Sequence, residues 1–262
     1  MARTPGPVLD VGLSLVIPAF NETGVIRSVV EEAAAKLAEI VSRFEVIVVD
    51  DGSSDGTGDD VPFSPLVRLV SHSRNRGYAD ALRSGFSAAR FGLVAFTDAD
   101  GQFDLADLRR LIPSAVRNGL AVGYRADRKD PWLRKVYSRG YNLLARTLCG
   151  TLARDCDCAL KVFRRDVLSA IWPRSKGYFV NTEMLTRARQ LGVPLAEFPV
   201  THRPRQGGVS KVSAREIPRV FRTLLAFWWR EMVFGAKPAT VSTTVFSARV
   251  RVPESSHAAR AA

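Results

Sequence analysis

The chain has 262 residues, of which 46% are apolar and 24% are charged, which is the composition of a globular protein with one sizeable core. This length allows one domain, or one domain with an appendage. The N-terminus lacks the apolar segment of a signal peptide, and no run of 18 apolar residues occurs. We therefore expect neither a leader nor a membrane span, and any contact with a membrane to be peripheral.

The basic charge is unevenly distributed. Residues 1–121 hold 12 basic and 16 acidic side chains, whereas residues 122–230 hold 22 basic and 8 acidic ones. The net charge of +12 therefore comes from the second half, and it indicates an anionic partner such as a phosphate, a membrane or a nucleic acid. The three cysteines form no CxxC pair and are odd in number, so we expect reduced thiols in a cytosolic protein.

Short apolar runs alternate with helical patterns in the first half. Strands are expected at residues 13–17, 44–49, 67–70 and 93–96, and helices at residues 25–41 and 78–89. This alternation predicts an α/β fold with a mostly parallel central sheet and helices on both faces. Ligands of such folds bind at the carboxyl ends of the strands, and polar residues gather there at 18–22, 50–55 and 98–102.

The second half adds two strand patterns, at residues 159–163 and 195–200. We place the main domain at residues 13–212, and its segment 203–211 has the glycine and polar content of a flexible loop. An amphipathic helix is expected within residues 213–235. Residues 236–262, which are rich in Ser, Thr, Ala and Arg, are expected to form a disordered tail.

The amphipathic helix contains tryptophans and has a basic flank. Its apolar positions follow helical spacing at Ile217, Val220, Phe221, Leu224, Leu225, Trp228 and Met232. An apolar stripe beside arginines is typical of a helix that lies in a membrane interface. It is also typical of a helix that packs on its own domain, so both arrangements stay open at this point.

Two aspartates follow the strand pattern at 93–96. Asp98 and Asp100 lie two residues apart, so in an extended chain both carboxylates point to one side and repel each other. A divalent cation such as Mg²⁺ or Mn²⁺ would relieve the repulsion, because it takes one or two carboxylates and completes its shell with water and phosphates. The alternative is a plain turn in which Asp98 caps the helix that starts near Leu105.

Polar clusters also follow the first two strand patterns. Asp50 or Asp51 can accept a hydrogen bond from a base edge or a ribose hydroxyl, and the alternative is an ordinary loop. Asn21 and Glu22 precede a helix, and here the alternative is ordinary capping of that helix.

Together the three clusters resemble those of the family 2 glycosyltransferases. VIPAFNE (16–22), VVDDGSSDGT (48–57) and DADGQ (98–102) match the IPxxNE, VVDDGSxDxT and DADxQ patterns of that family, in the same order. The resemblance covers residues 13–232 and implies a Rossmann-like GT-A fold, with residues 13–212 as the catalytic domain. It also implies an inverting enzyme that uses a nucleotide-diphosphate sugar and a divalent metal.

The second half is most similar to the polyprenyl-phosphate sugar transferases, the group that contains dolichyl-phosphate mannosyltransferase. The matching segments are GYR (123–125), WLRKVYSRGYNLLAR (132–146), DCDCALKVFRR (155–165) and RPRQGGVSK (203–211). This similarity implies transfer of a hexose, from a donor of the GDP-mannose or UDP-glucose type, to a dolichyl or undecaprenyl phosphate. It implies a peripheral protein on the cytoplasmic face of the membrane, with a separate membrane-anchoring subunit as a further candidate partner.

The resemblance also implies roles for individual residues. The residues expected to hold the nucleoside and the donor sugar are Pro18, Phe20, Glu22, Val49, Asp51 and Ala99. Those expected to hold the metal with the diphosphate are Asp98, Asp100 and Gln102. The expected catalytic residues are Asp100, Arg125, Arg134 and Ser138, and the cations expected to face phosphates are Arg125, Arg134, Arg205 and Lys211. A guanidinium suits this task because it binds phosphate oxygens in a bidentate manner.

The nature of the acceptor decides whether a catalytic base is needed. A phosphate monoester is mostly ionised at neutral pH and needs no base, whereas a sugar hydroxyl does. Family members that extend polysaccharides usually carry a Glu-Asp pair whose Asp acts as the base, and this chain has Asn181-Thr182-Glu183 in the comparable region. The difference favours the phosphate acceptor, with Glu183 as a base or as the structural partner of an arginine.

The chain departs from the family pattern in three places. Ala79 replaces a glycine of the GYGxAL motif, and residues 155–161 lack the glycine common in the mannosyltransferases, which leaves the donor sugar open. The two C-terminal membrane helices of many bacterial relatives do not occur in this sequence.

Three other functions compete with this interpretation. The nearest is a family 2 transferase that acts on a sugar hydroxyl of a glycan or glycolipid in cell-envelope polysaccharide synthesis. The charge alone suggests a nucleic-acid-binding protein. The sequence shows no motif that recognises nucleic acid, so we expect no nucleic-acid partner. The third is a catalytically silent sugar-nucleotide-binding subunit of a membrane complex.

Overall fold

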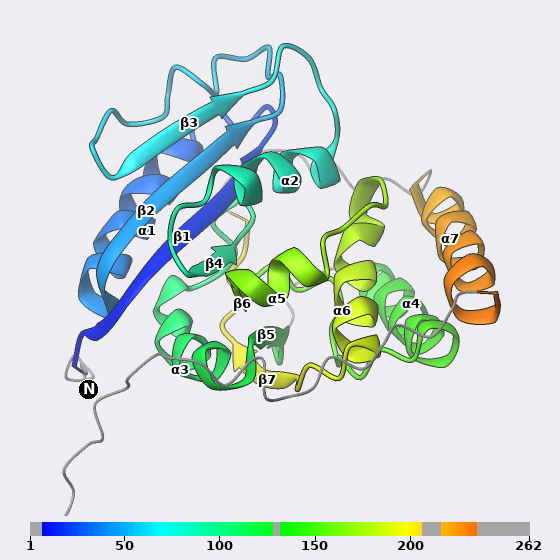
Figure 1. Cartoon of the computed structure of the whole chain (residues 1–262). Helices are drawn as coiled ribbons and strands as arrows, with labels where there is room; N and C mark the ends of the chain where they lie inside the picture. The colour runs from blue at the N-terminus through cyan, green and yellow to red at the C-terminus, as the bar shows by residue number, and fades with distance from the viewer. Residues whose placement is uncertain (1–6, 128–131, 206–215, 235–262) are drawn as a thin grey trace, which may run out of the picture.

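One mixed sheet forms the centre of the chain (Figure 1). The computed structural model describes residues 7–127, 132–205 and 216–234. Within them the strands are β1 (Leu9–Ala19), β2 (Val41–Asp50), β3 (Val67–Ser71), β4 (Leu93–Phe96), β5 (Leu120–Arg125), β6 (Lys161–Arg164) and β7 (Ala196–Val200). Their order is β3-β2-β1-β4-β6-β5-β7. The pairs among β1 to β4 and the β5–β7 pair are parallel, and β6 runs antiparallel to both neighbours, which confirms the prediction of a mostly parallel sheet.

Helices cover both faces of this sheet. They are α1 (Ile26–Ile40), α2 (Tyr78–Ala88), α3 (Leu108–Asn118), α4 (Trp132–Cys149), α5 (Arg165–Ala170), α6 (Val180–Gln190) and α7 (Glu216–Phe227), with short turns η1 (Leu105–Asp107), η2 (Gly177–Phe179) and the π-helical η3 (Trp228–Val233). On one face, Arg109 of α3 donates to the carbonyl of Glu39 in α1 at 2.6 Å. On the other, Phe86 of α2 packs against Trp172, just after α5, with ring centroids 6.3 Å apart. The α/β layering expected from the alternating pattern is therefore confirmed.

The central strands are buried on both sides, which explains their continuous apolar sequences. Every residue of β4 is buried, as are residues 13–19 of its neighbour β1 and residues 45–50 of β2, which pairs with β1 on the other side. A strand with helices on both faces needs no polar alternation, so such strands read as unbroken apolar runs. The sheet therefore holds the carboxyl ends of β1, β2 and β4 rigidly side by side.

Two elements differ from the sequence expectations. The strand β5 was not predicted, because its short run Leu120–Tyr124 contains a glycine and directly follows α3. The expected C-terminal helix is present, but α7 ends at Phe227 and continues as the π-helical turn η3. The disordered tail expected at residues 236–262 lies outside the described residues, and the boundary between residues 212 and 213 stays a prediction.

Two further sequence expectations concern membrane spans and thiols. Over the residues that the structure describes, no helix has the length and apolar character needed to cross a bilayer. Cys149, Cys156 and Cys158 are free and buried. Burial raises the pKa of the Cys156 and Cys158 thiols to about 12, so both are protonated at neutral pH.

Candidate functional site

The loops that follow β1 and β2 are tied together at the carboxyl edge of the sheet. The N–H of Asn21 donates to Ser53 Oγ at 2.9 Å, and the N–H of Glu22 donates to Thr57 Oγ1 at 2.8 Å. These bonds join the segment 18–22 to the segment 50–57. Because β4 is the next parallel strand, its own polar segment opens onto the same edge.

Gly52 makes the turn after β2 possible. Its φ of 72° lies in the left-handed region. A Cβ at this position would lie 2.3 Å from the carbonyl carbon of Arg74 and 2.7 Å from the backbone nitrogen of Asn75. The turn therefore needs glycine, and it brings the segment 72–77 against the end of β2.

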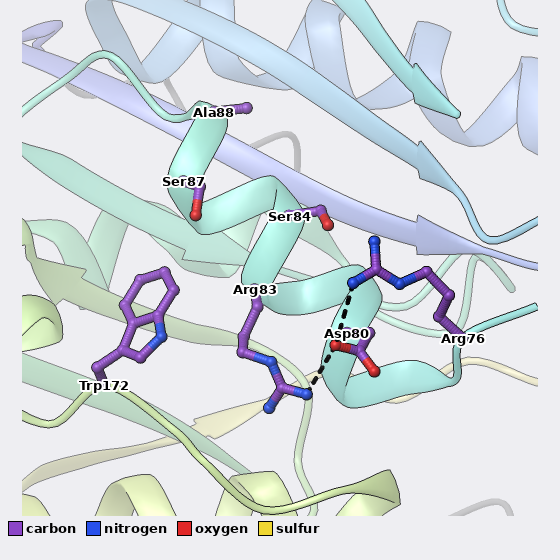
Figure 2. Close-up of a pocket in the computed structure, with 7 residues that line it drawn as sticks. All are labelled: Arg76, Asp80, Arg83, Ser84, Ser87, Ala88 and Trp172. Carbon is purple, nitrogen blue, oxygen red and sulfur yellow. Dashed lines mark hydrogen bonds and ion pairs between the residues drawn. The ribbon is translucent and has the colours of Figure 1, made fainter. Parts of the chain in front are cut away.

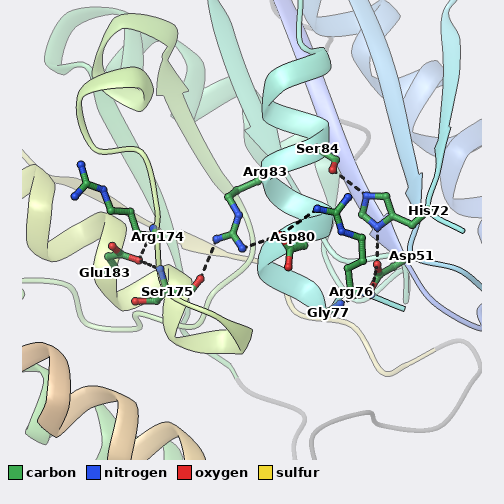
Figure 3. A network of polar contacts seen from close by, with 10 residues as sticks. All are labelled: Asp51, His72, Arg76, Gly77, Asp80, Arg83, Ser84, Arg174, Ser175 and Glu183. Atoms are coloured by element: carbon green, nitrogen blue, oxygen red, sulfur yellow. Dashed lines mark hydrogen bonds and ion pairs between the residues drawn. The ribbon is translucent and has the colours of Figure 1, made fainter. Parts of the chain in front are cut away.

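Asp51 is buried, and the segment after β3 fixes its carboxylate (Figure 3). It accepts the N–H groups of Arg76 at 2.9 Å and Gly77 at 2.7 Å, and it lies 2.6 Å from Nδ1 of His72. Since an ionised carboxylate only accepts, a neutral His72 ring carries its proton on Nδ1 and accepts the Ser84 hydroxyl at Nε2, 2.8 Å away. Sequence reasoning missed His72, whose signal is its place directly after the third strand.

Asp98 and Asp100 follow β4 and interact electrostatically. Burial, and after it the charge of Asp100, raises the pKa of Asp98 to about 7. The Tyr78 hydroxyl donates to Asp98 Oδ1 at 3.3 Å. The residue that caps the following turn is Asp104, which accepts the N–H of Ala106 at 3.0 Å. The alternative in which Asp98 caps this turn is therefore wrong.

Arg205 supplies a positive charge next to Asp100. Its Nη2 donates to Asp100 Oδ2 at 3.1 Å and lies 4.0 Å from Glu22 Oε1. Its Nε is buried and meets no acceptor among the described residues. A buried N–H without an acceptor is costly, and a phosphate oxygen would satisfy it.

Gln102 connects the segment after β4 to the one that carries Arg205. Its N–H donates to Asp100 Oδ1 at 3.1 Å, and its Nε2 donates to the carbonyl of Arg203 at 3.3 Å. The N–H of Arg203 donates back to the carbonyl of Gln102 at 2.7 Å. These contacts explain how Arg205, more than 100 residues away in the chain, reaches Asp100.

Arg125, at the end of β5, forms a bidentate ion pair with Asp155. Its Nε and Nη2 donate to the two carboxylate oxygens at 2.7 and 2.8 Å, and both side chains are only 7% exposed. Burial alone would lower the pKa of Arg125, but the hydrogen bonds and the charge of Asp155 outweigh it and raise that pKa. The positive charge of Arg125 also stabilises ionised Asp98.

Lys161 is a second residue that sequence reasoning missed. Its fully buried Nζ donates to the carbonyls of Cys156 at 3.0 Å and Cys158, and to Asn181 Oδ1 at 3.2 Å. It lies 5.2 Å from the ring centroid of Phe96. Burial lowers the pKa of Lys161. Its signal in the sequence was a single basic residue within the apolar strand pattern at 159–163.

The other predicted site residues lie in three places. Around the carboxyl edge are Pro18 in β1, Val49 in β2, Phe20 and Glu22 after β1, and Ala99 between the two aspartates. Ser138 is buried in α4, where its carbonyl accepts from Asn142 Nδ2 at 2.9 Å. Arg134 belongs to α4, but its side chain lies outside the description, and Lys211 lies outside the described residues altogether. The roles assigned to all these residues stay predictions.

Glu183 is a structural residue of α6 (Figure 3). Its Oε2 accepts the N–H groups of Arg174 at 2.9 Å and Ser175 at 2.7 Å. Its Oε1 accepts from Nε of Arg187 at 2.9 Å. With only 1% exposure and both oxygens engaged, Glu183 fits the role of an arginine partner better than that of a base.

A divalent cation fits Asp98 and Asp100 only if it takes ligands from outside the protein. Among the residues that the structure describes, no group of three or more His, Cys, Asp or Glu side chains is arranged to hold a metal. Two carboxylates suit Mg²⁺ or Mn²⁺ when water and substrate phosphates complete the shell. The raised pKa of Asp98 supports this fit, because a cation beside both carboxylates would offset their repulsion.

A separate open cavity of about 600 Å³ lies along α2 (Figure 2). Its lining residues are Arg76, Asp80, Arg83, Ser84, Ser87, Ala88 and Trp172. Asp80 pairs with Arg83 at 2.8 Å and with Arg76 at 3.7 Å, so a carboxylate of this cavity already offsets its cations.

Comparisons with known proteins agree with the fold. Solved structures of glucosyl-3-phosphoglycerate synthase from Mycobacterium tuberculosis have the same fold. The complex with UDP matches with a TM-score of 0.63 and 21% identity, over 83% of this chain and 80% of that one. The complex with Mn²⁺, UDP and glucosyl-3-phosphoglycerate matches with a TM-score of 0.62 and 21% identity, over 84% and 79%. The architecture is thus that of the GT-A glycosyltransferases.

Sequence comparison identifies the family. The sequence model of glycosyl transferase family 2 matches residues 14–172, and the chain belongs to this family. Dodecaprenyl-phosphate galacturonate synthase of Rhizobium johnstonii is 33% identical over 85% of this chain and 67% of its own length. Undecaprenyl-phosphate 4-deoxy-4-formamido-L-arabinose transferase of Serratia proteamaculans is 30% identical over 81% and 66%. Dolichyl-phosphate beta-glucosyltransferase of Dictyostelium discoideum is 27% identical over 87% and 80%. The chain therefore spans about two thirds of the length of the two bacterial relatives.

Proposed function

We propose that this glycosyltransferase moves a hexose from a nucleotide-diphosphate sugar to a polyprenyl phosphate, with inversion at the anomeric carbon. The observation that carries the proposal is the pair Asp98 and Asp100 at the carboxyl edge of the sheet, with Arg125 and Arg205 beside it. Two carboxylates and two guanidinium groups in one place suit a diphosphate held with a divalent cation. The relatives named for polyprenyl-phosphate substrates support the choice of acceptor.

The chain's own residues would stabilise the negative charge that develops on the departing nucleoside diphosphate. A bound Mg²⁺ or Mn²⁺, held by Asp98 and Asp100, would add Lewis-acid stabilisation of the same charge. Arg125 is preorganised by its bidentate bonds to Asp155, so its guanidinium needs little reorganisation during the reaction. The buried Nε of Arg205 supplies a further donor for a phosphate oxygen.

The nucleoside would bind at the ends of β1 and β2. Asp51 is held there by His72 and by two backbone N–H groups, which sets the direction of its remaining lone pairs. Its carboxylate would accept from a base edge or a ribose hydroxyl.

The acceptor would attack as an ionised phosphate, without a catalytic base. Glu183, the residue considered for that task, is buried with both oxygens bonded within the fold. This observation favours a polyprenyl phosphate over a sugar hydroxyl, because the hydroxyl has to lose its proton during attack.

We also infer a peripheral position on the cytoplasmic face of the membrane, where the lipid-linked phosphate and the nucleotide sugar meet. Supporting this position, α7 and η3 expose Phe221, Leu225, Trp229 and Val233 by 37 to 57%. The same element buries Leu224 and Phe227 against the domain, so packing on the domain and exposure of an apolar row occur together.

Transfer into lipid tests this function directly. The purified chain is incubated with undecaprenyl or dolichyl phosphate, Mg²⁺ or Mn²⁺, and a panel of radiolabelled UDP- and GDP-sugars that includes glucose, mannose and galacturonate. We expect label to enter the organic-extractable fraction with at least one donor. Label that enters only saccharide acceptors would contradict the proposal.

Asp100→Asn tests the role of the aspartate pair. We expect transfer to fall by about 100-fold or more, because one of the two carboxylates that would hold the metal is lost. The matched control is Asp10→Asn, at the opposite end of β1, where the carboxylate only accepts from Ser42 at 3.0 Å. Equal rates for the two variants, with unfolding curves like that of the parent chain, would remove Asp100 from the site.

A further inference from the structure

We propose that a basic cleft between α7 and the segment 174–176 binds the phosphate of an anionic membrane lipid. This inference rests on the membrane association proposed above and adds a specific site for the lipid headgroup. The cleft has a volume of about 340 Å³. Its lining residues are Arg174, Ser175, Lys176, Arg222, Thr223, Ala226, Phe227 and Arg230.

The charge of the lining defines the ligand class. Four of the eight lining residues are basic, none is acidic, and all four basic side chains belong to exposed residues. Of the carboxylates near the cleft, Glu183 binds Arg187 and two backbone N–H groups, whereas Glu231 pairs with the cleft residue Arg230 at 3.2 Å and lies 4.0 Å from Arg187. With Arg230 offset by Glu231, the lining still carries Arg174, Lys176 and Arg222, so the cleft stays positive, which suits a phosphate group.

The wall formed by the segment 174–176 is held in place before any ligand binds (Figure 3). Glu183 accepts the N–H groups of Arg174 and Ser175, and Nη1 of Arg83 donates to the carbonyl of Ser175 at 2.9 Å. These bonds fix the backbone and leave the Arg174 side chain exposed. A preorganised wall reduces the entropy lost when a ligand is bound.

An exposed apolar row beside the cleft favours a lipid bilayer as the source of the bound phosphate. Phe221, Leu225 and Trp229 repeat every four residues and are 37, 49 and 57% exposed. Each precedes a cleft residue by one position, so the apolar row runs beside the cationic row on the same element. A bilayer meets both rows at once: the apolar side chains enter the acyl boundary while the cations lie at the level of the phosphates.

The site also lies near α4, the helix that carries the predicted catalytic residues Arg134 and Ser138. The turn η3 packs against α4, and α7 packs against η2, the turn that directly precedes α6 (Figure 1). Binding of a headgroup in the cleft would hold this side of the domain against the membrane, where the polyprenyl phosphate is embedded.

Binding to vesicles tests the cleft. The full chain is sedimented with vesicles of phosphatidylcholine alone and with vesicles that also contain phosphatidylglycerol, and the double variant Arg222→Gln/Arg230→Gln is compared with the control Arg43→Gln/Arg117→Gln. Both variants lose two exposed arginines, but the control positions lie in β2 and α3. We expect the cleft variant to lose at least about tenfold in affinity for the anionic vesicles, and the control to lose much less.

Two further measurements separate the outcomes. Leu225→Gln should weaken binding to both kinds of vesicle, because it removes apolar contact rather than charge. Transfer to an acceptor dispersed in detergent should be unchanged in the cleft variant, because the enzyme then reaches its acceptor without binding to a bilayer. Equal loss in the cleft and control variants would overturn the headgroup site alone, and no binding to either vesicle would overturn the membrane association as well. A nucleic-acid duplex that binds more tightly than the anionic vesicles, with the loss confined to the cleft variant, would also overturn it.

Discussion

At the scale of single residues, the ion pair between Arg205 and Asp100 is the main charge contact at the aspartate pair. Arg205 supplies a positive charge next to Asp100, where the sequence led us to expect a divalent cation. A cation that binds both carboxylates therefore has to compete with this guanidinium. The phosphates that would arrive with the cation offer Arg205 a new partner, so the exchange need not leave any charge unpaired.

Arg205→Gln should therefore have opposite effects on two ligands. We expect Mn²⁺ alone to bind more tightly by about tenfold, because Asp100 loses its competing partner. We expect UDP in the presence of Mn²⁺ to bind more weakly, because a phosphate donor is lost. Isothermal titration calorimetry measures both affinities without any transfer reaction.

Arg203→Gln is the matched control for that experiment. Arg203 belongs to the same segment, but its guanidinium pairs with Glu32 and Asp104, each at 2.8 Å. Its loss should leave the affinity for Mn²⁺ nearly unchanged. The same gain in Mn²⁺ affinity in both variants would show that competition by Arg205 is not the cause.

At the scale of elements, Lys161 shows how β6 positions the site. This strand runs antiparallel between β4 and β5, and its first residue faces Phe96 on one side and Val122 on the other. From this position Nζ donates to the carbonyls of Cys156 and Cys158. These two residues follow Asp155, the partner of Arg125. The buried side chain of Lys161 thus helps to fix the segment that holds Asp155. Through Asp155 it helps to position Arg125, which is expected to face the donor.

Lys161→Met should destabilise the fold and impair transfer. It fills nearly the same volume but leaves two buried carbonyls and the Asn181 amide oxygen without their donor. We expect a loss of about 2 kcal/mol in the free energy of unfolding, measured by urea denaturation. The control is Lys36→Met in α1, where Nζ makes only a half-exposed contact with Glu39 at 3.3 Å. A Lys161→Met chain as stable as this control would refute the anchoring role.

At the scale of the whole molecule, Glu45 of β2 joins β1, β3 and the loop after α2 at the edge of the sheet opposite the site. Its Oε1 accepts from Ser14 Oγ at 2.7 Å and from the N–H of Arg90 at 2.8 Å. Its Oε2 accepts from Nη1 of Arg68 at 2.9 Å. Burial alone would raise the pKa of Glu45, but the hydrogen bonds of Ser14, Arg68 and Arg90 outweigh it and lower that pKa below 4.5.

The stabilisation by Glu45 should therefore depend on pH. Because its pKa is lower in the folded chain, this stabilisation is present above the unfolded pKa of about 4.5 and is lost as the pH falls through the folded value. We expect Glu45→Gln to lower the free energy of unfolding by about 2 kcal/mol at neutral pH, and by much less in acid. Urea denaturation across this pH range measures the difference. Glu39→Gln, which loses only an exposed pair with Lys36, should show no comparable pH dependence.

The sequence by itself was sufficient to predict the α/β class, the parallel core of the sheet and the three polar strand ends. The physical reason is that these features are local: periodicity shows which strands are covered on both faces, and parallel strands bring their carboxyl ends to one edge. The same information placed an amphipathic helix near residues 217–232. It could not show that Leu224 and Phe227 are buried while Leu225 and Trp229 are exposed.

Tertiary structure alone decided which side chains pair across long distances in the chain. Arg205 reaches Asp100 through the contacts of Arg203 with Gln102, and His72 reaches Asp51 because the Gly52 turn brings two loops together. The strand β5 and the buried Lys161 were missed for a related reason. A short strand, or a single lysine within a strand, can be recognised only from the neighbouring strands that pair with it. Charge pairing depends on distances in space, and the separation of two residues along the chain does not determine that distance.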